Sequence, residues 1–201
     1  MLALVGGLLA AAASSFPGGY SPAREAVSNL GNPVLNPFPG WLFFSLAFWS
    51  LSPLMVPAFA LYHRRLLPLA PSEARTGTLA ACVGLSGTTL LGFFPNVDET
   101  LVQHGVAALL SFGGLGAAAA SYWLATSRDA LRHALRTRDH ALLATLALVV
   151  VTFVAMTLAG LAQALNTDAF GGFAPWEWFT FVDVTFLLVV VGLLLPPDQA
   201  A

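Results

Sequence analysis

Long apolar stretches alternate with short polar ones along the whole chain. An apolar stretch of about 20 residues can cross the roughly 30 Å hydrocarbon layer of a membrane, because a helix rises about 1.5 Å per residue. Six stretches fit this template, although the first of them is short. The pattern therefore predicts an all-α protein, a six-helix transmembrane bundle. The expected spans are residues 1–16, 41–62, 76–94, 101–125, 140–165 and 178–195, within one domain over residues 1–201.

The first apolar stretch has two interpretations. Its small residues at positions 11–15 resemble the cleavage region of a signal peptide. It lacks the basic residues that begin such a peptide, so we favour an uncleaved helix. Under both interpretations the segment that follows lies on the same side of the membrane.

Small residues recur at every fourth position of the expected span 76–94. Ala80, Gly84, Thr88 and Gly92 therefore share one face of that helix. Small side chains let two helices approach closely in lipid. We expect this face to lie in a helix–helix contact.

The composition supports a membrane environment. Hydrophobic residues make up 57% of the chain and charged residues only 9%, whereas a soluble domain carries about 25% charged residues. The net charge of −2 argues against a nucleic-acid partner. The single cysteine, Cys82, excludes a disulfide within the chain and a cysteine-based metal site.

The positions of the Arg residues predict the orientation of the chain in the membrane. Seven of the eight basic residues lie in the connections after the second and the fourth expected spans, and all eight are Arg. The positive-inside rule makes those connections cytoplasmic, together with both termini. Absence of Lys and abundance of Ala and Pro are typical of a GC-rich bacterial genome, so we expect the bacterial cytoplasmic (inner) membrane. Contact with anionic lipid headgroups is expected for Arg64, Arg65, Arg128, Arg132 and Arg136.

The opposite, outer face is acidic. Within the expected spans near this face lie Asp183 and His104, and an isolated charge there costs about 2.5–3.5 kcal/mol, so both are candidate functional residues. Asp183 is equally consistent with a packing hydrogen bond between helices. Its candidate partners are Arg24, His104 and Thr185. The other acidic residues on this face are Glu25, Asp98, Glu99, Asp168 and Glu177.

Metal and haem chemistry are not indicated. A zinc site needs about three converging His, Cys or carboxylate ligands, and only one histidine lies on the outer face. His63 and His140 are candidate haem ligands, but their positions beside Arg at span ends favour side chains that reach the membrane surface. We therefore expect no metal and no cofactor.

The polar segment before the second span predicts a short interfacial helix. Ser21 followed by Pro22 is typical of a helix start, and Gly31 followed by Pro33 is typical of an end. We expect this helix to cover the outer mouth of the bundle like a lid. An ion pair would hold it, from Arg24 to one or more of Asp98, Glu99, Glu177 and Asp183.

Two short motifs resemble the DUF998 family of bacterial membrane proteins, which is distantly grouped with Frag1/DRAM/Sfk1 proteins. The resemblance implies a six-helix bundle and no settled activity. A Glu-Arg pair that is usual in that family before the last span is here Glu177-Trp178, so the role of that Arg is not transferred. The matching positions are Tyr20, Ser21, Ser28, Asn29, Leu30 and Gly31 in the first motif, and Gly92, Pro95 and His104 in the second.

Three functions fit these features. The one we favour is a non-catalytic membrane protein that binds lipid or serves as an accessory subunit, with membrane lipids and other integral membrane subunits as partners. The second is an outer-leaflet lipid hydrolase with Ser28, His104 and Asp183 as catalytic candidates. The third is a proton-coupled transporter that uses Asp183, although no pair of broken spans supports it.

Overall fold

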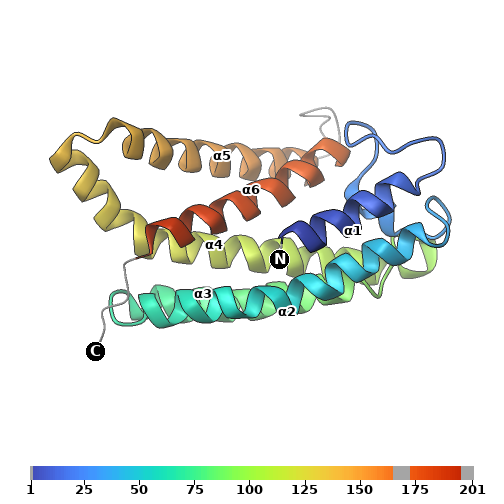
Figure 1. The fold of residues 1–201 in the computed structure, drawn as a ribbon, viewed down its shortest axis with the longest axis horizontal. Helices are drawn as coiled ribbons and strands as arrows, with labels where there is room; N and C mark the ends of the chain where they lie inside the picture. The colour runs from blue at the N-terminus through green and yellow to red at the C-terminus, as the bar shows by residue number, and fades with distance from the viewer. Residues whose placement is uncertain (1, 165–172, 196–201) are drawn as a thin grey trace.

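The computed structural model describes residues 2–164 and 173–195, and within them every regular element is a helix (Figure 1). The main helices follow the six apolar stretches of the sequence. They are α1 Leu2–Ser14, α2 Gly40–Leu66, α3 Pro71–Leu91, α4 Leu101–Thr137, α5 His140–Ala164 and α6 Phe173–Leu194. Two short 3₁₀ helices lie in the connections, η1 Val27–Gly31 and η2 Asp98–Thr100. The all-α prediction is confirmed.

Three of the described segments are long and apolar enough to cross a membrane. These are Gly40–Leu66, Asp98–Thr137 and Trp176–Leu194. Two shorter apolar helices, Ala3–Ser14 and His140–Thr152, accompany them. A membrane protein is the class that this distribution supports.

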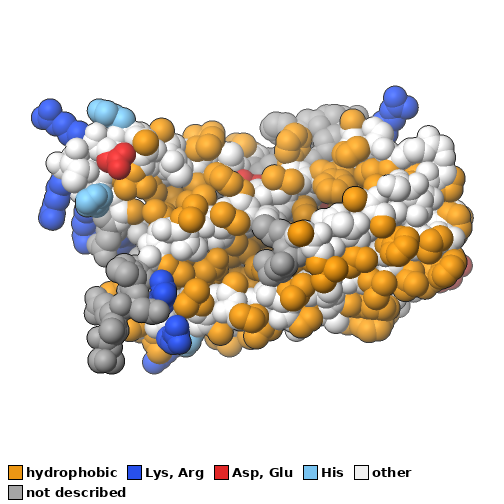
Figure 2. All heavy atoms as spheres, in the orientation of Figure 1, with side chains coloured by type: hydrophobic (Ala, Val, Ile, Leu, Met, Phe, Trp, Pro, Cys, Tyr) orange, Lys and Arg blue, Asp and Glu red, His pale blue; other side chains and the backbone are white. Residues whose placement is uncertain are grey.

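The helices run side by side along the long axis, so the connections gather at two ends (Figure 1). The α2–α3 and α4–α5 connections lie at one end, and those after α1 and α3 lie at the other. Figure 2 shows hydrophobic side chains over the middle of the molecule and most basic side chains at the first of these ends. Most Arg side chains therefore lie at the end that carries the α2–α3 and α4–α5 connections.

Helix α4 continues well past its expected apolar span. Its 37 residues correspond to about 55 Å, nearly twice the thickness of a bilayer core. Arg128, Arg132 and Arg136 lie in this extension and are exposed or partly exposed, as are Leu131 and Leu135 beside them. The helix therefore continues beyond its apolar span as a segment with both basic and apolar exposed side chains.

Helices α3 and α4 form the most extensive helix pair of the bundle. Glycines on both helices make this possible, because a Cβ added at Gly84 would lie 2.6 Å from the backbone nitrogen of Leu115. The Thr88 hydroxyl shares a 2.7 Å hydrogen bond with the Ser111 hydroxyl across the same contact. The predicted small-residue face packs against α4 at Gly84 and Thr88, whereas Gly92 lies against Trp49 of α2.

A hydrogen bond in the buried core joins α2 to α6. The Tyr62 hydroxyl donates a 2.9 Å hydrogen bond to the carbonyl oxygen of Leu188. Its ring packs edge-on against Tyr122 of α4, with 5.4 Å between ring centroids. Three helices that are distant in the sequence are thereby fixed relative to one another.

The connection between α1 and α2 differs from the expected amphipathic helix. Residues from Ser21 to Glu25 form a turn, in which the Ser21 carbonyl accepts hydrogen bonds from the amides of Arg24 and Glu25. Regular structure begins only at Val27, as the 3₁₀ helix η1. The prediction of a two-turn helix from Ser21 was therefore wrong, although Gly31 does end the helical segment. The apolar side of η1 is buried against protein, because Val27 and Leu30 are almost inaccessible.

Candidate functional site

A serine on η1 contacts a buried glutamate on α6. Both the backbone amide and the hydroxyl of Ser28 donate to Oε2 of Glu177, each at 3.3 Å. The two residues are deeply buried, with 3% of Ser28 and 4% of Glu177 exposed. This contact joins positions 149 residues apart in the chain, and it fixes the first connection to the start of α6.

Tyr20 explains why the connection turns at this point. Its hydroxyl donates to the carbonyl oxygens of Glu25 and Ala26 at 2.9 and 3.0 Å, and it accepts a 2.7 Å hydrogen bond from Nε1 of Trp178. The carbonyls that a helix from Ser21 would use internally are thus bound by a side chain. Burial raises the pKa of Tyr20 above its ordinary value of 10. The phenol therefore stays protonated and keeps its role as donor.

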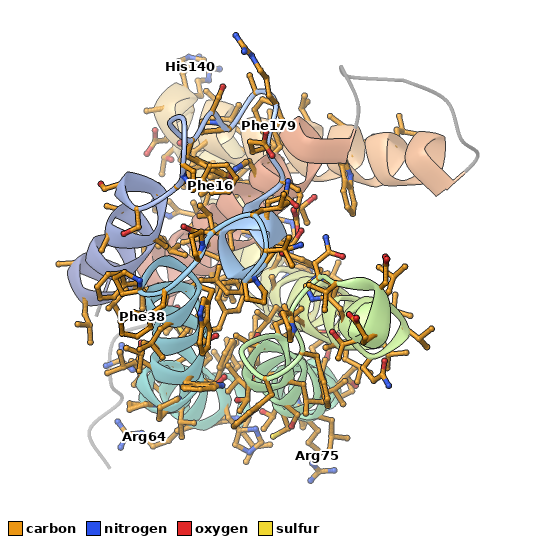
Figure 3. All side chains as sticks on the ribbon, turned by 90° about the vertical axis from the view of Figure 1, so that its right-hand side faces the viewer. Phe16, Phe38, Arg64, Arg75, His140 and Phe179 are labelled. Atoms are coloured by element: carbon orange, nitrogen blue, oxygen red, sulfur yellow. The ribbon has the colours of Figure 1, made fainter. Side chains whose placement is uncertain are left out.

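Asn36 secures the other side of the connection. Its side-chain amide donates to the carbonyl oxygens of Ala12 and Leu30, at 3.1 and 2.9 Å. Asn36 is completely buried, so this is a hydrogen bond inside the protein. In the end-on view of Figure 3, Phe16 and the connection that follows it lie over the middle of the bundle. The connection therefore lies over the end of the bundle, as the lid prediction requires, but hydrogen bonds hold it and not the predicted ion pair.

His104, near the start of α4, has one ring nitrogen bound and one free. Its Nδ1 lies 2.8 Å from the carbonyl oxygen of Phe94. A carbonyl only accepts, so Nδ1 carries the proton and Nε2 of the neutral ring is a hydrogen-bond acceptor. The side chain is 7% exposed. Phe94 thus orients an imidazole whose remaining nitrogen has no hydrogen-bond partner among the described residues.

Asp183 lies six residues beyond Glu177 on α6, or about 9 Å along the helix. Thr152 on α5 lies beside Asp183, and its hydroxyl donates to the carbonyl oxygen of Val149 at 3.1 Å. The expected partner Thr185 instead donates its hydroxyl to the carbonyl of Phe181, at 2.8 Å. The polar neighbour of Asp183 on α5 is therefore Thr152, which the sequence did not indicate.

These side chains share one cavity, which we call the α4–α6 groove. It has a volume of about 700 Å³ and is bounded mainly by α4 and α6. Its polar lining includes Ser28, His104, Glu177 and Asp183. Most of the rest is apolar or glycine. Other lining residues are Asn96, Leu101, Gly105, Ala108, Leu109, Phe112, Gly113, Gly116, Ala117, Trp176, Thr180 and Val184.

A second, smaller cavity adjoins the groove. It has a volume of about 320 Å³, and its walls come from α1, α2, α3, α4 and α6. Phe112 and Val184 line both cavities, so the two are neighbours inside the bundle. The smaller one is almost entirely apolar; Thr88 and Ser111 on its wall bond to each other.

The structure divides the predicted outer-face cluster into two sets. Glu177, His104 and Asp183 line the groove together with Ser28, as described above. Arg24, Asp98 and Glu99 are exposed and line no part of it. The expected ion pair is not formed: within the described residues, none joins Arg24 to any of the four predicted acids. Burial explains the difference, since Glu177 is reached by Ser28 from inside, where a solvated guanidinium would lose its water. The predicted acidic residue Asp168 lies outside the described residues.

At the opposite end, one of the predicted lipid-contacting arginines has a protein partner. Arg128 forms a 3.6 Å ion pair with Glu73 at the start of α3. Arg64 and Arg75 project from one side of the bundle and His140 lies on the opposite side (Figure 3). The candidate haem ligand His63 instead contacts α3, with 2.7 Å between its Nδ1 and the hydroxyl oxygen of Thr78. The described residues also contain no group of three His, Cys, Asp or Glu that could hold a metal ion.

Sequence reasoning missed two kinds of site residue. Thr152 carried no signal, because a threonine in an apolar stretch is ordinary. The glycines Gly105, Gly113 and Gly116 form part of the groove wall, where an added Cβ meets nothing within 4 Å. The cluster "GGLGAAAA" was visible as small residues, but only the tertiary structure shows that some face a cavity and others face α3.

Comparison of the chain with protein-family models, with curated proteins and with solved structures gives no match.

Proposed function

We propose that this protein is a non-catalytic, six-span membrane protein that binds a membrane lipid in the α4–α6 groove. The observation that carries the proposal is the groove itself. It combines a long apolar wall with a polar group at one end, the arrangement that an amphiphile with a headgroup and an acyl chain requires. Its volume lies within the range of about 300–1,000 Å³ that is usual for small-molecule sites.

The adjoining apolar cavity supports the same proposal. It lies next to the groove at Phe112 and Val184, and its walls offer almost no polar atom to a ligand. An acyl chain that follows the groove past these residues would be surrounded by protein. Apolar contact along the acyl chain would contribute most of the binding free energy, and the polar end would select the headgroup.

Topology and family assignment belong to the proposal as well. We place the Arg-rich connections and both termini in the cytoplasm of a bacterium, and the groove's polar end near the outer surface of its inner membrane. Exposed Arg side chains at the cytoplasmic end would contact anionic lipids. Membership in DUF998 is supported by the short motifs around Ser28 and His104. An accessory role beside other membrane subunits is compatible with lipid binding.

A lipid hydrolase is the second candidate, because Ser28 donates its hydroxyl to a carboxylate beside a histidine with a free Nε2. A serine nucleophile is usually activated by a base that a third group orients, with about 2.6–3.2 Å between nucleophile and base. Here the backbone amide of Ser28 donates to the same oxygen, at the same 3.3 Å. That double contact is the geometry of a structural clamp, so we favour binding over hydrolysis.

Filling the groove tests the proposal. A Cβ at Gly113 meets nothing within 4 Å, and this residue lines the groove, so Gly113→Leu should occupy the cavity without disturbing the described packing. We expect the variant to lose most of the lipid that the purified protein retains, measured by native mass spectrometry after delipidation and re-addition of lipid.

The matched control is Gly7→Leu. It adds the same side chain to α1, at a position where an added Cβ also meets nothing within 4 Å. Gly7 lines neither of the two cavities. Lipid retention should be unchanged there. Equal retention in the two variants would refute the groove as the lipid site. Turnover of an added phospholipid that Ser28→Ala abolishes would favour the hydrolase instead.

A further inference from the structure

We infer that the α4–α6 groove selects lipids whose headgroup ends in a primary ammonium group, such as phosphatidylethanolamine. This inference rests on the proposed lipid-binding function and names the chemistry of the headgroup. It follows from the side chains at the polar end of the groove: two carboxyl groups and a histidine line it, beside the N–H donors of Asn96 and Trp176, and within the described residues no Lys or Arg does.

The first acceptor is the carboxyl group of Glu177. Two hydrogen bonds from Ser28 end on Oε2, and the backbone of Val27 donates to the same carboxyl group. A carboxylate has about four lone-pair sites, so it keeps capacity to accept from a ligand. Because Glu177 is 4% exposed and lines the groove, a ligand in the groove is what can reach this carboxyl group.

The second acceptor is Nε2 of His104. The contact of Nδ1 with the Phe94 carbonyl assigns the proton to Nδ1, as argued above. The imidazole is 93% removed from solvent, since 7% of the side chain is exposed. His104 lines the groove, and a buried ring with an unpartnered acceptor on the wall of a cavity indicates a donor on the ligand that fills it.

The third and fourth acceptors lie deeper along α6. Asp183 supplies a second carboxyl group on the wall of the groove. The Thr180 hydroxyl donates to the carbonyl oxygen of Trp176, at 2.9 Å. Toward a ligand, the Thr180 oxygen can therefore only accept. Four side chains thus offer acceptors in succession over about two turns of α6 and the facing part of α4.

A primary ammonium group complements this set in number and in charge. It carries three N–H donors on one atom and a positive charge, so it can satisfy Glu177 and His104 together. Carboxylates in a membrane interior are costly without a cation, and no described cation lines the groove. Trp176, also in the wall, supplies an indole N–H, the type of donor that the phosphate of the same headgroup would accept from. An anionic headgroup would instead meet two carboxyl groups.

A lipid competition tests the inference on the whole protein. Delipidated protein in detergent is incubated with equimolar phosphatidylethanolamine, phosphatidylcholine and phosphatidylglycerol of identical chains, and bound lipid is counted by native mass spectrometry. Phosphatidylcholine carries the same charge without N–H donors. We expect phosphatidylethanolamine to exceed both others about tenfold, which corresponds to the loss of one hydrogen bond to a charged group.

Two carboxyl variants and one control locate the preference. Glu177→Gln and Asp183→Asn keep the size of each side chain, and each should reduce the preference severalfold. Glu99→Gln changes an exposed acid at the same end and should leave it intact. A preference that survives both groove variants overturns the inference. If Glu177→Gln fails to fold, Asp183→Asn and the wild-type competition still decide.

The remaining outcomes separate this inference from the proposed function. Equal binding of the three lipids, equal binding of the two ammonium lipids, or preference for phosphatidylglycerol refutes the ammonium headgroup while leaving lipid binding in place. Absence of any bound lipid refutes both the ammonium headgroup and the proposed lipid-binding function. Soluble glycerophosphoethanolamine serves as a further arm: displacement of the lipid by it at millimolar concentration would show that a free amine is the ligand and overturn the lipid.

Discussion

Gly113 and Gly114 are neighbours on α4 with opposite surroundings. A Cβ at Gly113 meets nothing within 4 Å, whereas one at Gly114 would lie 2.6 Å from the Cα atom of Gly84 and 2.9 Å from the carbonyl oxygen of Ala80. Ordinary contact begins at 3.4 Å, so Gly114→Ala forces α3 and α4 apart by roughly 1 Å. Separation of that size also lengthens the 2.7 Å hydrogen bond between Thr88 and Ser111.

The expected cost follows from comparing the two alanine variants. Each replaces a helical glycine, so the gain in helix propensity, about 1 kcal/mol in water, is the same in both and cancels in the comparison. What remains is the overpacking of the α3–α4 contact, which typically costs about 1–3 kcal/mol. A gap of about 0.5–1 Å already forfeits a quarter to a half of the dispersion energy of the contacts along it. We therefore expect Gly114→Ala to be about 1–3 kcal/mol less stable than Gly113→Ala.

Unfolding in mixed micelles measures this difference. Helical circular dichroism is followed while the mole fraction of dodecyl sulfate rises, for the wild-type protein and both variants. Gly113→Ala should unfold at or above the wild-type midpoint and Gly114→Ala clearly below it. Coincident midpoints for the two variants would show that the backbones of α3 and α4 do not touch at this point, and the close packing described for them would be wrong.

Two further predictions concern the first connection. Ser28→Ala removes the hydroxyl donor to buried Glu177 and should destabilise the protein by about 1 kcal/mol in the same assay. The control Ser86→Ala, whose exposed hydroxyl bonds its own helix, should leave the stability unchanged, and equal effects of the two variants would contradict a special role for the Ser28–Glu177 contact. Burial raises the pKa of Tyr20, so its contribution is complete below pH 10 and declines as pH rises further. The loss of stability between about pH 10 and 11 should therefore be smaller in Tyr20→Phe than in the wild type, and parallel curves would refute the assignment.

The chain's local chemistry was sufficient to predict the helices. The span expected at 140–165 corresponds to α5, His140–Ala164, and that at 41–62 to α2, Gly40–Leu66. Apolar length and helix ends are properties of neighbouring residues, so they are visible in the sequence. The small-residue face of α3 was visible for the same reason, because positions four apart share one side of a helix.

The contacts that build the groove were not predictable in this way. The sequence suggested that Arg24, the most conspicuous charge of the first connection, would pair with the outer acids, yet Ser28 holds Glu177 from 149 residues away. The sequence shows which residues are charged. It does not show which carboxyl group is buried, and therefore not the free energy that a guanidinium would lose in giving up its water to reach that group.

Sequence alone determined an all-helical chain with enough apolar length to enter a membrane, with seven of its eight Arg in two of the connections. Tertiary structure decided which of those acids and which histidine meet: Glu177, Asp183 and His104 share a cavity, while Asp98 and Glu99 stay outside it. The physical reason is that helix formation depends on residues within a few positions of each other. Convergence of a site depends on the rotation and spacing of α4 against α6, which the packing of the whole bundle sets.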